Sequence, residues 1–351
     1  MMGSRCRSDV ADGNGAVVEG KTRGRPHGAV PVALISFGES KRKCKRSITM
    51  KSEAVRINFM LLSLLYLWVS PGVAAEDDQA ALIQQARAAA AKKDFSQAVS
   101  LATRAIKAAP KQKEAWLLRA QLYRLQRDHA KAAADYSEVI KLDARYAPAY
   151  QSRGEAHFKC GKIAESIEDF DAFLKLAPDQ KPHHWQRGIS LYYAGRFADG
   201  KKQFELHQTV NAHDVENAVW HFLCTARAEG MEMAKKKLIP IEGDARVPMA
   251  QVHQLFAGKA SPQDVLTTAQ SAPSSTLAGE PLFYAHLYLG LYYEAIGDRA
   301  NAHEYILKAA ERSKANGYMG DVARVHAERL KKNRLEQRGD HGAGVLGRLV
   351  L

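Results

Sequence analysis

A period of 34 residues is the feature of this sequence that most constrains its fold. Steps of 34 from Ala86 reach only small residues, namely Ala120, Gly154 and Gly188. Two more sets of residues recur with the same step. The residues of one set are all small: Ala98, Ala132, Ser166 and Gly200. Those of the other set are mostly large: Ala102, Tyr136, Phe170 and Phe204. Such agreement without a slip in register predicts a stack of similar supersecondary units.

Each period is predicted to contain two helices. In Tyr150–Pro178, two helical segments flank a turn near Gly161, and Pro178 cannot continue the second helix. Alanine is abundant and β-branched residues form few runs, which favours helix. Small residues let the two helices of a pair approach closely, and we expect the large residues of the second helix to fill the gap to the next pair. The chain is therefore predicted to be all-α.

This helix–turn–helix unit resembles the tetratricopeptide repeat. The resemblance implies a right-handed superhelical solenoid of antiparallel helix pairs. Four tetratricopeptide repeats are expected in residues 76–212, degenerate helix pairs in 213–281 and a C-terminal repeat in 282–312. The repeats thus account for most of the chain.

The degenerate region is predicted to hold two incomplete pairs. The first spans 215–237 and is broken at Glu229–Gly230, and the second spans 247–271 with a turn that begins at Gly258. Leu238–Arg246, which contains a proline and a glycine, is predicted to be an irregular linker between them.

The end of the chain is predicted to close the stack. Residues 313–336 are expected to form a capping segment whose helix, Asp321–Glu336, is polar enough to face water, as solenoid ends require. Residues 337–351 are expected to be a disordered tail.

Two different segments precede the repeats. Residues 1–49 are rich in Gly, Arg and Lys without periodicity, so we expect disorder or a start codon placed too far upstream, with a basic interaction arm as the alternative. Residues 50–75 have the layout of a signal peptide: a charged front, the apolar run Ile57–Val69 and a small-x-small site that ends at Ala75. We expect an exported protein of the periplasm or cell envelope. Its contact with the membrane is limited to this segment, as an anchor if it stays uncleaved.

The net charge of +13 does not indicate a nucleic-acid-binding protein. Residues 1–49 contribute ten Lys/Arg against four Asp/Glu, or +6, and 50–75 contribute +1, which leaves +6 for residues 76–351. An excess this mild is well short of a basic stripe. No nucleic-acid partner is expected.

No catalytic, cofactor-binding or metal-binding residue is expected. His303 begins an H-E-x-x-H pattern, but Leu307 occupies the second ligand position. His221 and Cys224 could share a metal, yet two ligands make no site and a role in the core is favoured. Cys160 and Cys224 fall in non-adjacent repeats, so we expect two buried free thiols. The chain is predicted not to be an enzyme.

Further stretches narrow the resemblance. They are DVENAVWHFL at 214–223 and the run Phe283–Asp298, with Leu255–Gly258 and Asp264–Leu266 between them. Their order resembles the NlpI type of bacterial envelope repeat protein. That resemblance implies an adaptor, often dimeric, that docks a C-terminal-processing protease and peptidoglycan hydrolases in the cell envelope. The lipid-acceptor cysteine of that type is missing at the cleavage site, so the lipid anchor is left without support.

A peptide-binding groove is expected along the first helices of the repeats. The groove-facing positions of a tetratricopeptide repeat correspond here to Gln121, Arg124, Gln151, Glu155, Phe158, Trp185, Ile189, Tyr192 and Tyr193. The Lys and Asn pair of the chaperone-binding carboxylate clamp is absent from its positions, so that partner class is disfavoured. The aromatic side chains offer a large contact area for an extended or helical peptide.

The groove residues leave two functions open. The first is an exported adaptor that binds protein partners through the groove. The second is a structural, self-associating envelope protein in which the aromatic residues form a homodimer interface. In either case, some of the aromatic residues could instead pack on the neighbouring repeat.

Overall fold

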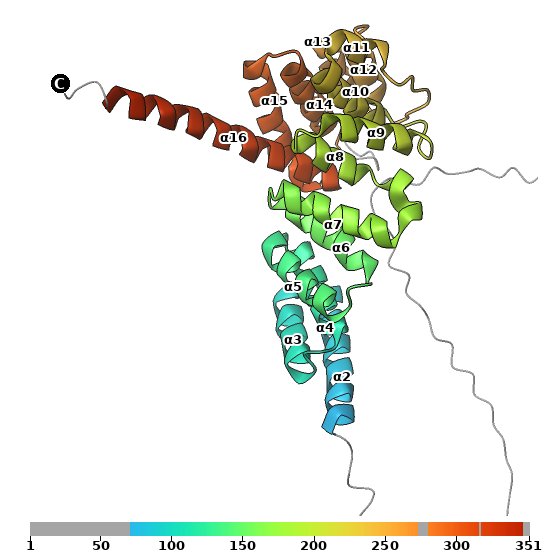
Figure 1. Ribbon diagram of the computed structural model, residues 1–351, viewed down its shortest axis with the longest axis vertical. Helices are drawn as coiled ribbons and strands as arrows, with labels where there is room; N and C mark the ends of the chain where they lie inside the picture. The colour runs from blue at the N-terminus through green and yellow to red at the C-terminus, as the bar shows by residue number, and fades with distance from the viewer. Residues whose placement is uncertain (1–70, 273–279, 316, 347–351) are drawn as a thin grey trace, which may run out of the picture. The chain divides into compact units, whose positions relative to one another are not determined.

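The computed structural model describes residues 71–272, 280–315 and 317–346, and within these ranges the chain forms helices and no strand (Figure 1). The predicted basic extension and most of the predicted signal peptide, up to residue 70, lie outside the described residues. The first described helix, α2 (Pro71–Ala91), contains the predicted cleavage site at Ala75. No helix in the described ranges is long and apolar enough to cross a membrane.

Four helix pairs occupy the first part of the described chain. They are α2 with α3 (Phe95–Ala108), α4 (Lys113–Leu125) with α5 (His129–Leu142), α6 (Ala147–Lys159) with α7 (Ile163–Leu176), and α8 (Trp185–Tyr193) with α9 (Phe197–Gln208). A 3-10 helix, Pro178–His183, connects the third pair to the fourth. Each helix packs on the next, both within pairs and between them. The predicted all-α fold of helix pairs is therefore confirmed.

The turn inside each of these pairs uses a left-handed backbone at a periodic position. The residues with positive φ recur every 34 positions, at Lys93, Arg127, Gly161 and Gly195. In the first two pairs an aspartate follows, and the Asp94 and Asp128 side chains accept hydrogen bonds from backbone N–H groups of the helix that they begin. The period therefore encodes the turn and the start of the second helix as well as the packing.

Glycine at the reference position of a first helix makes room for an aromatic ring of the same pair. A Cβ atom on Gly154 would lie 2.7 Å from the Phe170 ring, and one on Gly188 would lie 2.6 Å from the Phe204 ring. The same rings also reach the next pair, as expected, since ring centroids lie 4.6 Å apart for Phe170 and His184 and 6.4 Å apart for Phe204 and Trp220. The rings pack into their own pair because the absent side chain of the glycine leaves space there.

An arginine ladder, formed by Arg119, Arg153 and Arg187, joins successive pairs. Arg153 of α6 donates hydrogen bonds to Asp169 of α7 at 2.6 Å and to Ser137 of α5 at 3.0 Å. The equivalent partners one period away are Asp135 and Thr103 for Arg119, and Gln203 and Asp171 for Arg187. Each arginine thus connects a first helix to two second helices, one in its own pair and one in the preceding pair. The arginines of the ladder recur every 34 residues, with the same period as the small reference residues.

The helices after α9 are shorter and less regular. They are α10 (Val215–Glu229), α11 (Met231–Lys236), α12 (Met249–Phe256) and α13 (Pro262–Ser271), followed by the last pair, α14 (Pro281–Ala295) and α15 (Arg299–Glu311). The chain between α11 and α12, which includes Leu238–Arg246, contains no helix. Arg246 fixes this segment to the start of α10 through Asp214 and Glu216, each at 2.5 Å.

The last helix, α16 (Gly317–Leu346), differs from the predicted capping helix in length and in burial. It continues past Glu336, so residues 337–346 are helical, where a disordered tail was expected. Its first part does not face water, because every residue from Met319 to Ala327 except Arg324 is buried. The sequence misleads here because the buried stretch contains aspartate and histidine, which are typical of an exposed helix.

The buried apolar side chains form one large cluster and two smaller ones. The large cluster contains residues between Phe158 and Ala327, and therefore combines helices from α6 to α16. The smaller clusters lie within Leu82–Leu122 and Ala120–Ala149. The core is thus divided in the first repeats and continuous in the rest of the described chain.

Candidate functional site

The predicted groove residues on α4 and α6 form the polar groove end, which we define as Gln121, Arg124, Gln151 and Glu155. Arg124 is exposed and Gln121 is half-buried near the end of α4. Gln151 and Glu155 are half-buried on α6, where the Gln151 amide donates a hydrogen bond of 3.2 Å to the Glu155 carboxylate. All four side chains keep surface that a partner could contact.

The remaining groove residues form the aromatic groove end, which we define as Phe158, Trp185, Ile189, Tyr192 and Tyr193. All except the half-buried Trp185 are buried. Tyr318 of α16 covers this end, with its ring stacked on Phe158 at 5.4 Å between centroids and edge-on to Trp185 at 5.1 Å. The role of these residues in peptide binding stays a prediction, and it now requires that α16 move away. The same condition applies to the predicted homodimer interface.

An aspartate near the start of α16 contacts two different repeats. Asp321, whose side chain is only 6% exposed, lies 2.5 Å from Arg127 in the turn between α4 and α5. It also lies 3.6 Å from Lys159, the last residue of α6. Arg324 donates a hydrogen bond of 2.8 Å to the backbone carbonyl of Lys159. These contacts hold the first part of α16 against the second and third pairs.

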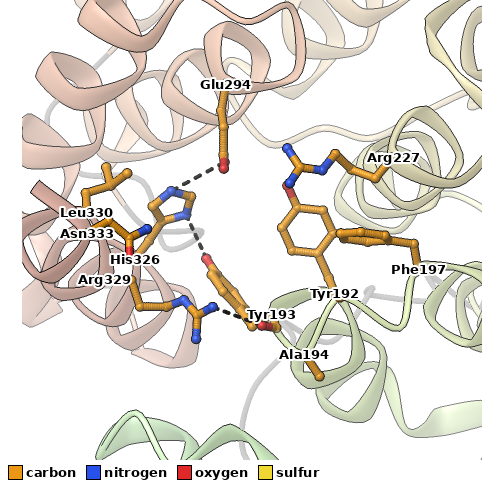
Figure 2. A pocket seen from close by; sticks show the side chains of 11 residues that line it. Tyr192, Tyr193, Ala194, Phe197, Arg227, Glu294, His326, Arg329, Leu330 and Asn333 are labelled. Atoms are coloured by element: carbon orange, nitrogen blue, oxygen red, sulfur yellow. Dashed lines mark hydrogen bonds and ion pairs between the residues drawn. The ribbon is translucent and has the colours of Figure 1, made fainter. Parts of the chain in front are cut away.

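A histidine one turn further along α16 contacts α8 and α14 (Figure 2). Nδ1 of His326 lies 2.9 Å from the Tyr193 hydroxyl, and Nε2 lies 3.4 Å from the Glu294 carboxylate. Burial lowers the pKa of His326 and raises the pKa of Tyr193 well above its ordinary value. The neutral imidazole therefore accepts the tyrosine O–H at Nδ1 and directs its Nε2–H toward Glu294. This contact fixes α16 against α8 and α14.

A cavity of about 350 Å³ opens beside this contact, between residues of α8, α9, α10, α14 and α16 (Figure 2). Tyr192 and Phe197 form an aromatic wall, and Arg227 and Arg329 extend from α10 and α16. A second cavity of about 770 Å³ shares four of its lining residues with the first: Arg227, Glu294, Leu330 and Asn333. The two cavities are therefore neighbours.

Two buried histidines have polar partners within the repeats. His184 begins α8, where its Nδ1 accepts the Arg187 backbone N–H at 3.3 Å and its Nε2 lies 2.6 Å from the Gln151 amide oxygen. His221 occupies the next arginine-ladder position, 34 residues after Arg187, and lies 3.4 Å from Glu205. Among the described residues there is no group of three His, Cys, Asp or Glu side chains that could hold a metal.

The two cysteines of the repeats differ in exposure. Cys224 is buried and free, and burial raises the pKa of its thiol. Cys160 is also free but exposed, at the end of α6. The expectation of two buried thiols is therefore wrong for Cys160, which lies where the first helix gives way to the turn.

Comparison with known proteins identifies the repeats. Residues 83–147 and 147–180 match two family models, both described as tetratricopeptide repeat. No curated protein matches the sequence. A tetratricopeptide repeat protein from Parabacteroides merdae is similar in structure, with 14% identity and a TM-score of 0.49 over 72% of this chain and 98% of that one. The pilF protein of Pseudomonas aeruginosa shares 13% identity, with a TM-score of 0.39, over 68% of this chain and 93% of its own. The period, the helix pairs and the matched models together show that this chain contains tetratricopeptide repeats.

Proposed function

We propose that this protein is a non-enzymatic scaffold that binds peptide segments of partner proteins at its polar groove end. The observation that carries the proposal is the difference between the two ends of the groove. Phe158 is fully buried beneath α16, whereas Arg124 is exposed on the first helix of a repeat that the family models match. A partner can therefore reach the polar groove end without any rearrangement.

The chemistry of the polar groove end suits an extended or helical peptide. Arg124 has no ion-pair partner among the described residues, so its guanidinium can accept a carboxylate of the partner. Gln121 and Gln151 carry amides that donate and accept hydrogen bonds to a peptide backbone. The Glu155 carboxylate, 3.4 Å from Lys159, adds a negative group beside them. Mixed charge of this kind favours recognition of specific side chains over general attraction to one sign of charge.

Site-specific photocrosslinking in living cells tests this proposal. A benzophenone amino acid replaces Arg124 in the full-length chain, and a control chain carries it at Glu168, which is exposed on α7. We expect discrete crosslinked partners from position 124 and none of these partners from position 168. Identical products at the two positions, or no product at position 124, would contradict the groove assignment.

We further propose, from the resemblance to NlpI-type proteins, that the scaffold acts in the bacterial cell envelope and links a processing protease to peptidoglycan hydrolases. The signal-peptide layout of residues 50–75 supports export. Cell fractionation and N-terminal sequencing of the mature protein test export, and a new N-terminus at Glu76 is expected. Mass spectrometry of the crosslinked partners tests the pathway, which is contradicted if neither a protease nor a cell-wall hydrolase is among them.

A tyrosine variant tests whether α16 limits access to the rest of the groove. Tyr318→Ala removes the ring that covers Phe158 and Trp185. We expect faster amide hydrogen exchange in the first turns of α16, and new crosslinks from a benzophenone amino acid placed at Trp185 of this variant. If exchange in α16 increases and position 185 still yields no partner, the aromatic groove end is part of the core only.

A further inference from the structure

Four arginines surround the two neighbouring cavities, which together we call the basic cavity. Arg227 extends from the end of α10, Arg299 from the start of α15, and Arg329 and Arg334 from α16. Three separate elements thus bring guanidinium groups to one hollow. The arrangement depends on α16 lying in the groove, because half of the arginines belong to that helix.

None of these four arginines forms an ion pair with a carboxylate within the described part of the chain. Arg227 lies over the Phe197 ring at 5.3 Å, and Arg329 lies over the Tyr193 ring at 5.6 Å and donates to the Tyr193 carbonyl at 3.1 Å. In contrast, each arginine of the ladder already contacts an acidic side chain. The guanidinium groups of the basic cavity therefore keep hydrogen-bond donors for a ligand.

Among the described residues that line the basic cavity, one carries a carboxylate. It belongs to Glu294, which faces Nε2 of His326 at 3.4 Å. Four arginines against one carboxylate leave an excess of three positive charges in a partly enclosed space, where fixed charges act more strongly than on an open surface. Tyr192, Phe197 and Leu330 add apolar wall. This combination offers positive charge to several carboxylates and apolar surface to the chain that carries them.

We propose that the basic cavity binds an acidic peptide segment of a protein partner, which rests on the scaffold function proposed above. A guanidinium pairs with a carboxylate through two parallel hydrogen bonds. The four groups come from three elements and line two neighbouring cavities, so they fit several carboxylates spaced along a chain better than one compact anion. The combined volume is large enough for a few residues of peptide. This site is separate from the polar groove end and adds a second point of contact for a partner.

Fluorescence anisotropy with a labelled hexaglutamate peptide tests this assignment on the full-length chain. The test variant is Arg227→Gln with Arg299→Gln, since neither residue lies on α16 and both are exposed. The matched control is Arg104→Gln with Arg145→Gln. Both arginines are exposed in the first repeats, and their substitution removes the same charge as the test variant does. We expect the Kd for hexaglutamate to rise about tenfold or more in the test variant and to stay within about twofold in the control.

The outcomes separate this site from general attraction to a basic protein. Equal loss of binding in the two variants, or no loss in the test variant, overturns the assignment. A hexaglutamine peptide should not bind, and inorganic phosphate should compete only weakly. Binding of phosphate that matches that of hexaglutamate would make the site a phosphate site and would also overturn the proposal. Crosslinks from Arg124 that persist in the test variant leave the proposed function intact, so failure of one proposal is distinguishable from failure of the other.

Discussion

The first repeats and the later helices are stabilised in different ways. In the region of α2 to α5, two small buried clusters rich in alanine accompany the polar contacts of the arginine ladder. From α6 to α16, one continuous cluster contains most of the large aromatic side chains, and a helix from the end of the chain closes it. Apart from the pair of Arg127 and Asp321, the first region is built from contacts between neighbours in sequence. The second region also uses contacts across more than 130 residues within its buried core.

This difference indicates how stability is distributed along the chain. A stack whose units contact only their neighbours can lose one unit without losing the others. A continuous core with a closing helix is expected to unfold as one cooperative unit, because removing any helix exposes the same cluster. We therefore expect the first repeats to open locally and the later helices to open together.

The largest expected effect is that of Trp220→Ala in the continuous core. Trp220 is 1% exposed, and its ring contacts Tyr192 at 5.3 Å and Phe204 at 6.4 Å between centroids. Truncation of such a side chain lowers the free energy of unfolding by about 4 kcal/mol. Hydrogen exchange should accelerate throughout α8 to α16 and change little in α2 to α5.

The matching variant in the divided core is Leu122→Ala. Leu122 is 2% exposed and belongs to the smaller cluster of Leu82–Leu122. Faster exchange should be confined to α2 to α5. If either variant accelerates exchange equally in both regions, the chain unfolds as one unit and the proposed division is wrong.

The second effect concerns the ion pairs that join the first repeats. Arg119→Met leaves the Asp135 carboxylate, 5% exposed, without its guanidinium partner. We expect a loss of about 3 kcal/mol in the free energy of unfolding, because an uncompensated charge stays buried. Urea denaturation measures this loss. The double variant that also carries Asp135→Asn should recover part of it, and the absence of any recovery would show that packing of the arginine stem is the main contribution.

The smallest effect is a pH dependence from His184, which begins α8. Burial lowers its pKa from 6.5 to about 4. Between these two pH values the imidazole is neutral in the folded protein and protonated in the unfolded chain. This contribution to stability is present above pH 6.5 and is lost as the pH falls toward 4, by about 1.4 kcal/mol per pH unit. His184→Asn keeps an acceptor for the Arg187 N–H and cannot titrate there. Its urea midpoint should fall less between pH 6.5 and 4.5 than that of the unchanged chain, and an equal fall would exclude His184 as the cause.

The part of the structure that could be predicted from sequence is the part with local, repeated contacts. The steps of 34 residues locate the turns at Gly161 and Gly195 and the small reference residue Gly154, and the same steps from Arg119 would have revealed the arginine ladder. All of these contacts join residues of the same or adjacent repeats. Because these contacts are periodic, the residue pattern that indicates them occurs several times along the chain.

The covered half of the candidate site could not be predicted for the same physical reason. The contacts of Tyr318, Asp321 and His326 with the groove occur once, so no period marks them. The segment around Asp321 has the mixed composition of an exposed helix, although its charges are neutralised inside the fold by Arg127 and Lys159. The predicted groove residues lie on the first helices α4, α6 and α8, while the contact of Tyr318 with their aromatic members was missed.

The position of α16 at the end of the chain has a consequence for protein synthesis. A ribosome completes α2 to α9 long before it reaches Tyr318, because domains emerge from the N-terminus onward. During that interval Phe158 and Trp185 lack the ring that later covers them. Every newly made molecule therefore exposes these aromatic side chains for a short time, until the last helix completes the core that α6 to α16 share.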